Sequence, residues 1–192
     1  TRWVPTEWRL VGSPRESVED VLALAQAGDA IAAEPDEAPE SRVLPENLSH
    51  VIFTSGTTGR PTGVMVRHSS VVVLLHWMRE TFSDEERSSV LFSTSVNFDV
   101  SVAEIFGTLC WGGKLVLVEN VLELPSVPAA EEVRYVGMVP TAAAELLRTG
   151  AIPASVRSVN LAGEAVPAPL AAAVHALGHV RVVRNLYGPT ED

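Results

Sequence analysis

The chain has 192 residues, of which 46 % are hydrophobic, so it is long enough to bury a core. Its formal net charge of −10 argues against binding to nucleic acid or to an anionic membrane, because both repel an acidic surface. No apolar run approaches the roughly 20 residues that span a bilayer, and the first residues lack the apolar core of a secretory signal. A globular, cytoplasmic protein is therefore expected. The single cysteine, Cys110, gives no internal disulfide and is expected to be buried.

The first 46 residues differ in composition from the rest. They carry ten carboxylates and only four arginines, which is more than half of the net charge. Apolar residues at helical spacing predict a short helix over residues 17–27. Residues 34–46 are rich in proline and acidic side chains, as a solvated linker is. We predict an acidic segment over residues 1–46 and a folded core over residues 47–192.

From Leu48 onward, apolar strands alternate with helices. The predicted strands are residues 50–54, 90–93, 114–118, 134–138, 156–161 and 180–186, and the predicted helices are residues 68–82, 101–109, 141–148 and 167–177. This alternation is typical of an α/β fold in which helices cover a mostly parallel sheet.

A glycine- and threonine-rich stretch, FTSGTTGRPTGV at residues 53–64, follows the first predicted strand. Glycines let backbone N–H groups converge and hydroxyl groups add donors, so such a turn at the carboxyl end of a strand can hold a phosphate. It is not a Walker A loop, because Gly59 is followed by Arg60 and Pro61 instead of a lysine. A phosphate loop is favoured, and a flexible surface turn is the alternative.

The same stretch resembles the phosphate-binding signature of the adenylate-forming superfamily, which includes the adenylation domains of nonribosomal peptide synthetases, acyl-CoA synthetases and luciferases. Three further segments follow in the family's order. NFDVSVAEIFGTLCWGGKLV at 97–116 resembles the substrate-binding segment of the amino-acid-activating branch, NLAGEAV at 160–166 the segment beside the adenine pocket, and NLYGPTED at 185–192 the motif for adenine, phosphate and magnesium. The resemblance covers about residues 47–192 and implies part of the N-terminal, large subdomain of such an enzyme.

This resemblance implies a site for ATP and Mg²⁺. Adenylation joins a carboxylate to the α-phosphate of ATP and releases pyrophosphate, so donors and a cation must surround the phosphates. Thr190 would donate to the α-phosphate, and Glu191, if it is more than an exposed carboxylate, would bind Mg²⁺. Tyr187 would stack on adenine, unless it is an aromatic residue of the core. The other residues implied to bind the nucleotide are Thr54, Ser55, Gly56, Thr57, Thr58 and Gly59 at the β- and γ-phosphates, and Gly163, Glu164 and Asn185 at the adenine.

Asp99 distinguishes the branches of the family. In amino-acid-activating members, the aspartate of FDxS accepts the α-ammonium group of the substrate, and the two opposite charges offset each other's desolvation. The alternative is that Asp99 only caps the helix that follows. Ser101 and Glu104 have the spacing of a capping box, so they could cap that helix instead, and an amino-acid substrate is favoured.

The resemblance also implies the residues that line the substrate pocket. Many family members have tryptophan where Ala103 stands. Ala103 together with Gly137 would open the pocket for a bulky or aromatic side chain, to which Asn160 offers a hydrogen bond. The implied substrate-binding residues are Asp99, Val100, Ala103, Gly137, Asn160, Ala162 and Leu186.

Two features depart from the family pattern. Thr62 stands where members usually have a lysine, and the loss of that cation should weaken nucleotide binding. The sequence ends at Asp192, before the family's hinge and the C-terminal subdomain with its catalytic lysine. We therefore expect a truncated core that is inactive alone, because the lysine acts in the transition state. Apolar surface that the other subdomains would cover is expected to promote self-association or binding to a complementary fragment.

Three functions are compatible with these residues. The favoured one is the core of an amino-acid-adenylating domain, which would pass its product to a carrier-protein thiol. The second is a non-catalytic remnant that acts as a binding or interaction module, suggested by Thr62 and the abrupt end. The third is an acyl- or aryl-acid-activating ligase, in which Asp99 is only a cap.

Overall fold

The computed structural model describes residues 33, 35, 37, 40–54 and 62–191. The helix predicted over residues 17–27, loop residues 55–61 and Asp192 lie outside the described residues. Residues 40–47 are exposed and form neither helix nor strand. Within the described part of the chain, no helix is long and apolar enough to cross a membrane.

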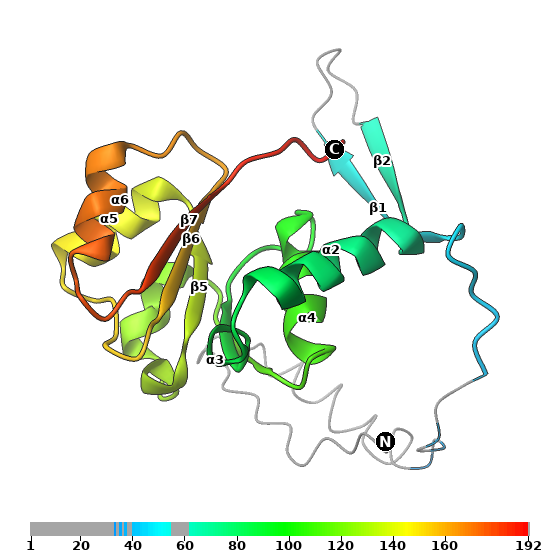
Figure 1. Cartoon of the computed structure of the whole chain (residues 1–192), viewed down its shortest axis with the longest axis horizontal. Coiled ribbons are helices and arrows are strands. Elements are labelled where there is room, and N and C mark those ends of the chain that lie inside the picture. The colour runs from blue at the N-terminus through cyan, green and yellow to red at the C-terminus, as the bar shows by residue number, and fades with distance from the viewer. Residues whose placement is uncertain (1–32, 34, 36, 38–39, 55–61, 192) are drawn as a thin grey trace, which may run out of the picture.

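The described residues form two sheets with helices packed around them (Figure 1). The strands are β1 (Leu48–Thr54), β2 (Thr62–Arg67), β3 (Ser89–Phe92), β4 (Lys114–Leu117), β5 (Tyr135–Met138), β6 (Ser158–Ala162) and β7 (Val182–Leu186). The helices are α2 (His68–Thr81), α3 (Asp84–Arg87), α4 (Val100–Leu109), α5 (Pro140–Arg148) and α6 (Ala168–His175), with 3₁₀ helices η1 (Val121–Ser126) and η2 (Ala130–Glu132). The sequence predicted neither α3 nor the 3₁₀ helices.

β1 and β2 form an antiparallel hairpin that is separate from the larger sheet. Ile52 lies opposite Val64, and Thr54 lies opposite Thr62. The first predicted strand therefore belongs to a hairpin and not to the parallel sheet, and residues 62–64, interpreted as loop, begin a strand. The reason is local: the segment TGVMVR returns directly beside β1 and pairs with it without the crossover that a parallel partner needs.

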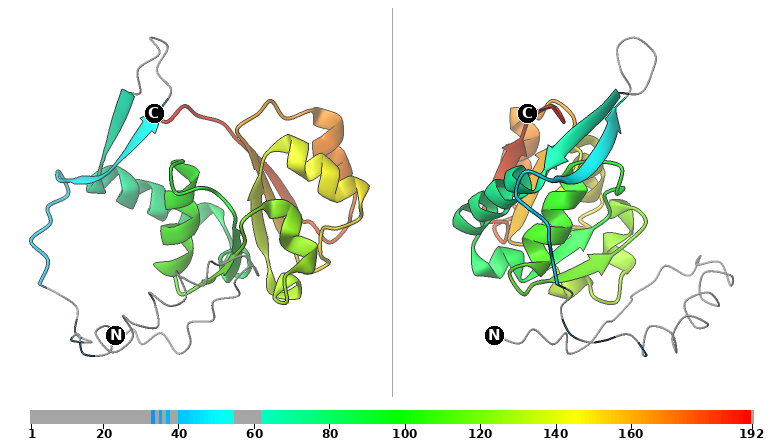
Figure 2. Two further views of the ribbon diagram at one scale, coloured as in Figure 1. Left: turned by 180° about the vertical axis from the view of Figure 1, so that it is seen from behind. Right: turned by 90° about the vertical axis from the view of Figure 1, so that its right-hand side faces the viewer.

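The larger sheet has the strand order β4-β3-β5-β6-β7, and every neighbouring pair is parallel. The predicted α/β fold with a parallel, helix-covered sheet is confirmed. Figure 2 shows from two further sides that the β1–β2 hairpin stands apart from this sheet. The strands of one parallel sheet all end at the same edge, which is where ligands gather in open α/β folds.

One side of this sheet, named here the apolar face, packs against α5 and α6 (Figure 1). Its strand residues are fully buried and join one hydrophobic cluster: Leu91, Val136, Val159 and Leu161. Ala143 of α5 and Val174 of α6 complete the contact from the helix side. Burial of these aliphatic side chains is the main source of stability in the described fold.

The opposite side, named here the polar face, is turned toward α2 and α4. Tyr135 of β5 packs there with Met78 of α2 and with Phe82 and Val90. Alternation along the strands places three polar residues on this side as well, namely Ser158, Asn160 and Arg184.

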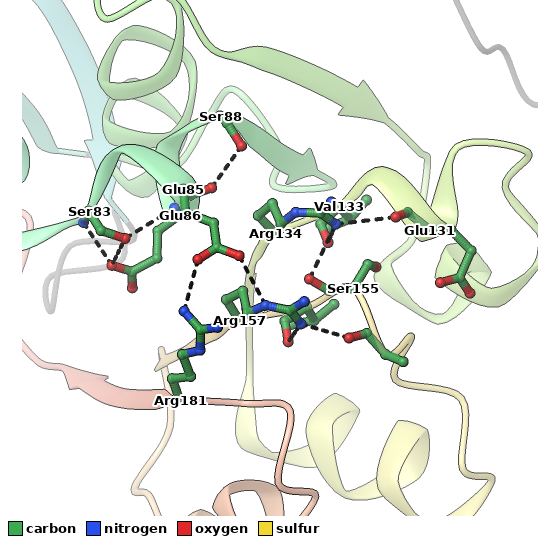
Figure 3. A network of polar contacts seen from close by, with 12 residues as sticks. Ser83, Glu85, Glu86, Ser88, Glu131, Val133, Arg134, Ser155, Arg157 and Arg181 are labelled. Carbon is green, nitrogen blue, oxygen red and sulfur yellow. Dashed lines mark hydrogen bonds and ion pairs between the residues drawn. The ribbon is translucent and has the colours of Figure 1, made fainter.

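Helix α3 holds the amino ends of β6 and β7 (Figure 3). Glu85 accepts a hydrogen bond from Arg157 at 3.1 Å and another from Arg181 at 2.9 Å. Arg157 and Arg181 each precede a strand, so these ion pairs lie at the edge opposite to the one where the strands end.

A second ion pair lies deeper on the polar face. Nη1 of Arg184 donates to Glu86 and to the Ser158 hydroxyl, each at 2.7 Å, and the guanidinium group stacks 4.1 Å from the centre of the Phe82 ring. Burial alone would raise the pKa of Glu86, but hydrogen bonds from Arg184, Ser83 and Ser158 outweigh it and hold the pKa below its ordinary value. The charges on this part of the face are therefore fully paired.

Candidate functional site

The segments implied to bind substrate and nucleotide follow the carboxyl ends of parallel strands. Asp99 comes after β3, Gly163 after β6 and Tyr187 after β7. Residues 93–99, 163–167 and 187–191 therefore share one edge of the sheet, named here the carboxyl edge. In Figure 1 the chain after β7 leaves the sheet on the side of the β1–β2 hairpin.

The glycine-rich loop joins the two strands of that hairpin. Thr54 ends β1 and Thr62 begins β2, and the Thr54 hydroxyl donates to the Thr62 carbonyl oxygen at 3.5 Å. The residues between them that were assigned to the phosphates lie outside the described residues: Ser55, Gly56, Thr57, Thr58 and Gly59. The hairpin places the two ends of this loop, Thr54 and Thr62, opposite each other.

The nucleotide motif after β7 lies largely at the surface. The Tyr187 side chain is 96 % exposed, so Tyr187 is not an aromatic residue of the core and its ring is free to stack. Asn185 and Glu191 are also exposed, and Thr190 is half-buried. An exposed ring and an exposed carboxylate are compatible with adenine stacking and with metal binding, respectively.

Gly163 and Glu164 shape the loop after β6. Gly163 has φ +82°, a left-handed conformation that favours glycine. The Glu164 carboxylate accepts from the Thr141 backbone N–H at 3.1 Å and from its hydroxyl at 3.0 Å. Glu164 thereby satisfies a donor in the first turn of α5, whose own cap residue Val139 offers no side-chain acceptor. The geometry fixes the loop beside the place implied for adenine.

Asp99 caps α4 in this structure. Its Oδ1 accepts from the Val100 backbone N–H at 2.7 Å, and the side chain is half-buried. The capping box predicted from Ser101 and Glu104 is wrong: Ser101 lies inside the helix and donates to the Phe98 carbonyl oxygen at 2.6 Å. In the described part of the chain, no lysine or arginine pairs with Asp99.

Four of the residues implied to line the substrate pocket meet on the polar face. In the strand register Gly137 lies opposite Asn160, and Ala162 lies opposite Leu186. The other three, Asp99, Val100 and Ala103, lie at the start of α4, which packs over the same side. The structure thus brings together residues from three strands and one helix that are far apart in the sequence.

The argument that Gly137 enlarges the pocket is wrong. A Cβ atom on Gly137 would lie 2.4 Å from Oε1 of Glu104, so the space that the glycine leaves is already filled by that carboxyl group. Ala103 is partly buried against the cluster around Tyr135. The expectation of a bulky or aromatic substrate now depends on Ala103 alone.

Glu104 is a residue of this site that the sequence did not identify. Its side chain is 1 % exposed, and neither carboxyl oxygen has a hydrogen-bond partner of ordinary geometry. Burial raises the pKa of Glu104 to about 7; the nearby Thr94 hydroxyl offsets part of this rise without completing such a hydrogen bond. Burial, helped by the neighbouring Glu104, also raises the pKa of Tyr135.

Glu191 would have to bind a metal as a single protein carboxylate. Among the described residues, no group of three or more acidic, histidine or cysteine side chains could hold a metal ion. Mg²⁺ commonly keeps several waters and is bound by one or two carboxylates together with substrate phosphates. One exposed carboxylate at the carboxyl edge is therefore compatible with magnesium that arrives with a nucleotide.

Cys110 was expected to be buried, and it is exposed instead. It is the C-cap residue of α4, where the helix meets the turn before β4.

Comparison with known proteins decides the family. Residues 8–192 match the family described as AMP-binding enzyme. The chain belongs to this AMP-binding enzyme family. The match begins well before residue 47 and so includes most of the acidic segment, in which the sequence alone revealed no resemblance. The boundary at residue 46 stays a prediction.

The curated relatives are large synthetases, of which this chain spans a small part. One of the polypeptides of linear gramicidin synthase from Brevibacillus parabrevis is 51 % identical over 189 residues, which is 98 % of this chain and 4 % of that polypeptide. The AMB antimetabolite synthetase AmbB of Pseudomonas aeruginosa is 44 % identical over 171 residues, which is 89 % of this chain and 14 % of AmbB.

Solved structures share the fold at low sequence identity. The N-terminal domain of FACL13 from Mycobacterium tuberculosis has a TM-score of 0.72 at 19 % identity, with 85 % of this chain and 42 % of that chain covered. PA1221, a nonribosomal peptide synthetase protein with adenylation and PCP domains, has a TM-score of 0.67 at 21 % identity, with 83 % and 33 % covered. These structures confirm the predicted α/β fold, which in FACL13 is that of the N-terminal domain.

Proposed function

We propose that this chain is the core of an amino-acid adenylation domain. It would form an aminoacyl-adenylate from ATP and an amino acid, and the aminoacyl group would then pass to the thiol of a carrier protein. The match to the AMP-binding family and the 51 % identity to a gramicidin synthase polypeptide support this reaction class. The proposed partners are the carrier protein and the remaining adenylation subdomains, without which we expect no turnover, and the proposed location is the cytoplasm.

The observation that carries the proposal is the state of Asp99. It is a half-buried carboxylate at the carboxyl edge, beside a strand face that holds four of the implied pocket residues. Within the described residues it has no cationic partner. A substrate ammonium group would supply the missing charge, and the pair would offset the desolvation of both groups.

The nucleotide would bind at the same edge. ATP supplies the α-phosphate that the amino-acid carboxylate attacks, with pyrophosphate as the leaving group. Thr190 would donate to the α-phosphate, Glu191 would hold Mg²⁺ together with the phosphates, and Tyr187 would stack on adenine. Gly163 and Glu164 would hold the loop beside the adenine, whose edge Asn185 would bind. Thr54 and Ser55–Gly59 would surround the β- and γ-phosphates, with affinity reduced by Thr62.

A second function, activation of an acyl or aryl acid, is favoured by one observation. Asp99 caps α4, which is the role expected of it if the substrate has no ammonium group. Isothermal titration of the chain with a nonhydrolysable aminoacyl-adenylate mimic, and with the same mimic lacking its amino group, separates the two. We expect binding that depends on the amino group and that Asp99→Asn weakens about tenfold to a hundredfold, because a charged partner is lost.

A matched control is Asp84→Asn, since the Asp84 side chain is 98 % exposed. It should leave both affinities unchanged. Equal affinity for the two mimics would instead support the acyl- or aryl-acid function. Binding of neither mimic, by this chain and by the protein with its remaining subdomains restored, would support a non-catalytic module.

A further inference from the structure

A set of buried polar groups lies under α4 on the polar face, and is named here the acceptor cluster: Glu104, Tyr135 and Asn160. Asn160 is 1 % exposed, and its Nδ2 donates to the Tyr135 hydroxyl at 3.1 Å. Its Oδ1 has no hydrogen-bond partner among the described residues. The oxygens of Glu104 have none of ordinary geometry either, although the Thr94 hydroxyl lies near enough to lower the pKa of the carboxyl group. Three buried oxygen atoms therefore lack a well-formed hydrogen bond from a donor.

Such a cluster is unusual, because buried polar atoms in folded proteins nearly always find a partner. No lysine or arginine of the described chain forms an ion pair with Glu104. Elsewhere on the same face, Glu86 is fully paired with Arg184. Among the described residues, Ser89, Trp111 and His179 each also have one buried polar atom without a partner, but only Glu104 and Asn160 bring several such oxygen atoms together, beside the implied pocket residues.

A glycine on β5 leaves room for the Glu104 carboxyl group. Gly137, which lies opposite Asn160 in the strand register, has no side chain, and a Cβ atom there would lie 2.4 Å from Oε1 of Glu104. The absence of a side chain at Gly137 therefore leaves room for the Glu104 carboxyl group against β5. Gly137 and its neighbour Asn160 are both residues that would line the pocket.

We propose that Glu104 is a further specificity-determining residue, which acts beside the already implied Asn160 by accepting a hydrogen bond from an N–H or O–H group on the side chain of the amino acid. The inference rests on the proposed function and deepens it, since it names the class of side chain at that site. A site built to pair with a substrate donor rejects an analogue that lacks it, because its own buried polar groups then stay unpaired. The alternative occupant of the cluster is buried water, which would give no such discrimination.

The test is amino-acid-dependent exchange of pyrophosphate into ATP by the complete enzyme that carries this chain. Substrates are compared as near-isosteric pairs: tyrosine with phenylalanine, threonine with valine, glutamine with methionine, and lysine with norleucine. We expect the best substrate to be the member with the donor and to exceed its partner in kcat/KM by at least about a hundredfold. Glu104→Gln, which replaces one acceptor by a donor, should reduce this ratio at least about tenfold, mainly through KM.

Two further variants keep the test decisive. Gly137→Ala leaves Glu104 in the sequence but displaces its flexible carboxyl end, so it should reduce the ratio as well, even if Glu104→Gln fails to fold. Glu145→Gln, on the exposed surface of α5, should not change the ratio. A best substrate without a side-chain donor, or a ratio unchanged in both Glu104→Gln and Gly137→Ala, would overturn the inference and leave the proposed function intact. No exchange with any amino acid would overturn both.

Discussion

The two faces of the parallel sheet are made by the same strands and serve different purposes. On the apolar face, Val159 and Leu161 of β6 are fully buried among aliphatic side chains. On the polar face, their neighbours Ser158 and Asn160 are equally buried but polar. Alternation along a strand thus lets one segment contribute both to the core and to the proposed binding site. The difference teaches that burial alone does not mark a residue as structural.

The polar face is itself divided. Toward the amino ends of the strands, Arg184, Glu86 and Ser158 satisfy one another. Toward the carboxyl edge, Glu104 and Asn160 keep unpaired oxygen atoms. Paired polar groups stabilise the fold, whereas unpaired ones reduce stability and are retained where a ligand uses them. Three substitutions can break or sharpen this contrast.

The largest effect is expected on the apolar face. Leu161→Ala should lower the free energy of unfolding by about 4 kcal/mol, because the side chain is fully buried and its loss leaves a cavity. Urea denaturation followed by circular dichroism measures it. Leu122→Ala is the control, since Leu122 is 43 % exposed and should cost much less. Equal costs at the two positions would contradict the view that this face supplies the stability.

Substitution of Arg184, in the part of the polar face where charges are paired, should have the next largest effect on the free energy of unfolding. Arg184→Met should lower the free energy of unfolding by about 3 kcal/mol, because Glu86, with a side chain 8 % exposed, is left without its cation. Arg148→Met removes an arginine from an exposed pair and should change little. Adding Glu86→Gln to Arg184→Met should recover part of the loss in the same denaturation assay. Failure to recover it would show that the stacking on Phe82, and not the ion pair, is what Arg184 contributes.

In the part of the polar face with unpaired oxygen atoms, Glu104 should have the smallest effect on the free energy of unfolding, and this effect should depend on pH. The pKa of Glu104 is raised from 4.5 to about 7, so the folded protein holds this proton more tightly than the unfolded chain does. The stabilisation that results from this bound proton is complete below pH 4.5 and is lost as the pH rises through 7. Relative to Glu104→Gln, the free energy of unfolding should fall by about 2 kcal/mol between about pH 5 and pH 8.

Denaturation curves over that pH range measure the fall. The groups facing Glu104 from the sheet are Tyr135, which stays neutral because burial raises its pKa, and beyond it the Arg184–Glu86 pair, which stays charged. Glu145→Gln should not alter the pH dependence, since Glu145 is ionised throughout the range. A difference between wild type and Glu104→Gln that does not change with pH would show that Glu104 is already ionised when buried.

Much of the fold could be predicted from the sequence. From residue 68 onward, every predicted strand and helix lies within two residues of its observed ends. The positions of Asp99, Gly163 and Tyr187 after parallel strands also followed from the motifs. The predictions that failed depended on contacts that the spacing of residues in the sequence does not reveal. The glycine-rich segment hid the start of β2, because a turn and the strand after it share a composition rich in glycine and threonine.

Glu104 was interpreted as part of a capping box because it lies three residues after Ser101. Its actual environment is set by Gly137 and Tyr135 on a strand much later in the chain, and no local pattern reports that contact. One signal was available: strand sequences such as Tyr135-Val-Gly-Met and Ser158-Val-Asn-Leu alternate polar or small residues with aliphatic ones. That alternation predicts a second, polar face, which the general description of the strands as apolar did not include.

The ion pairs of Glu85 with Arg157 and Arg181 have a practical consequence for engineering. They connect the amino ends of β6 and β7 to α3, at the sheet edge opposite to the segments that would contact ligands. Chimaeras in which residues 163–167 or 187–191 are replaced by those of a relative should therefore keep their thermal stability, while their ligand selectivity changes. A replacement of residues 163–167 must keep a side chain that accepts hydrogen bonds from Thr141, as Glu164 does here.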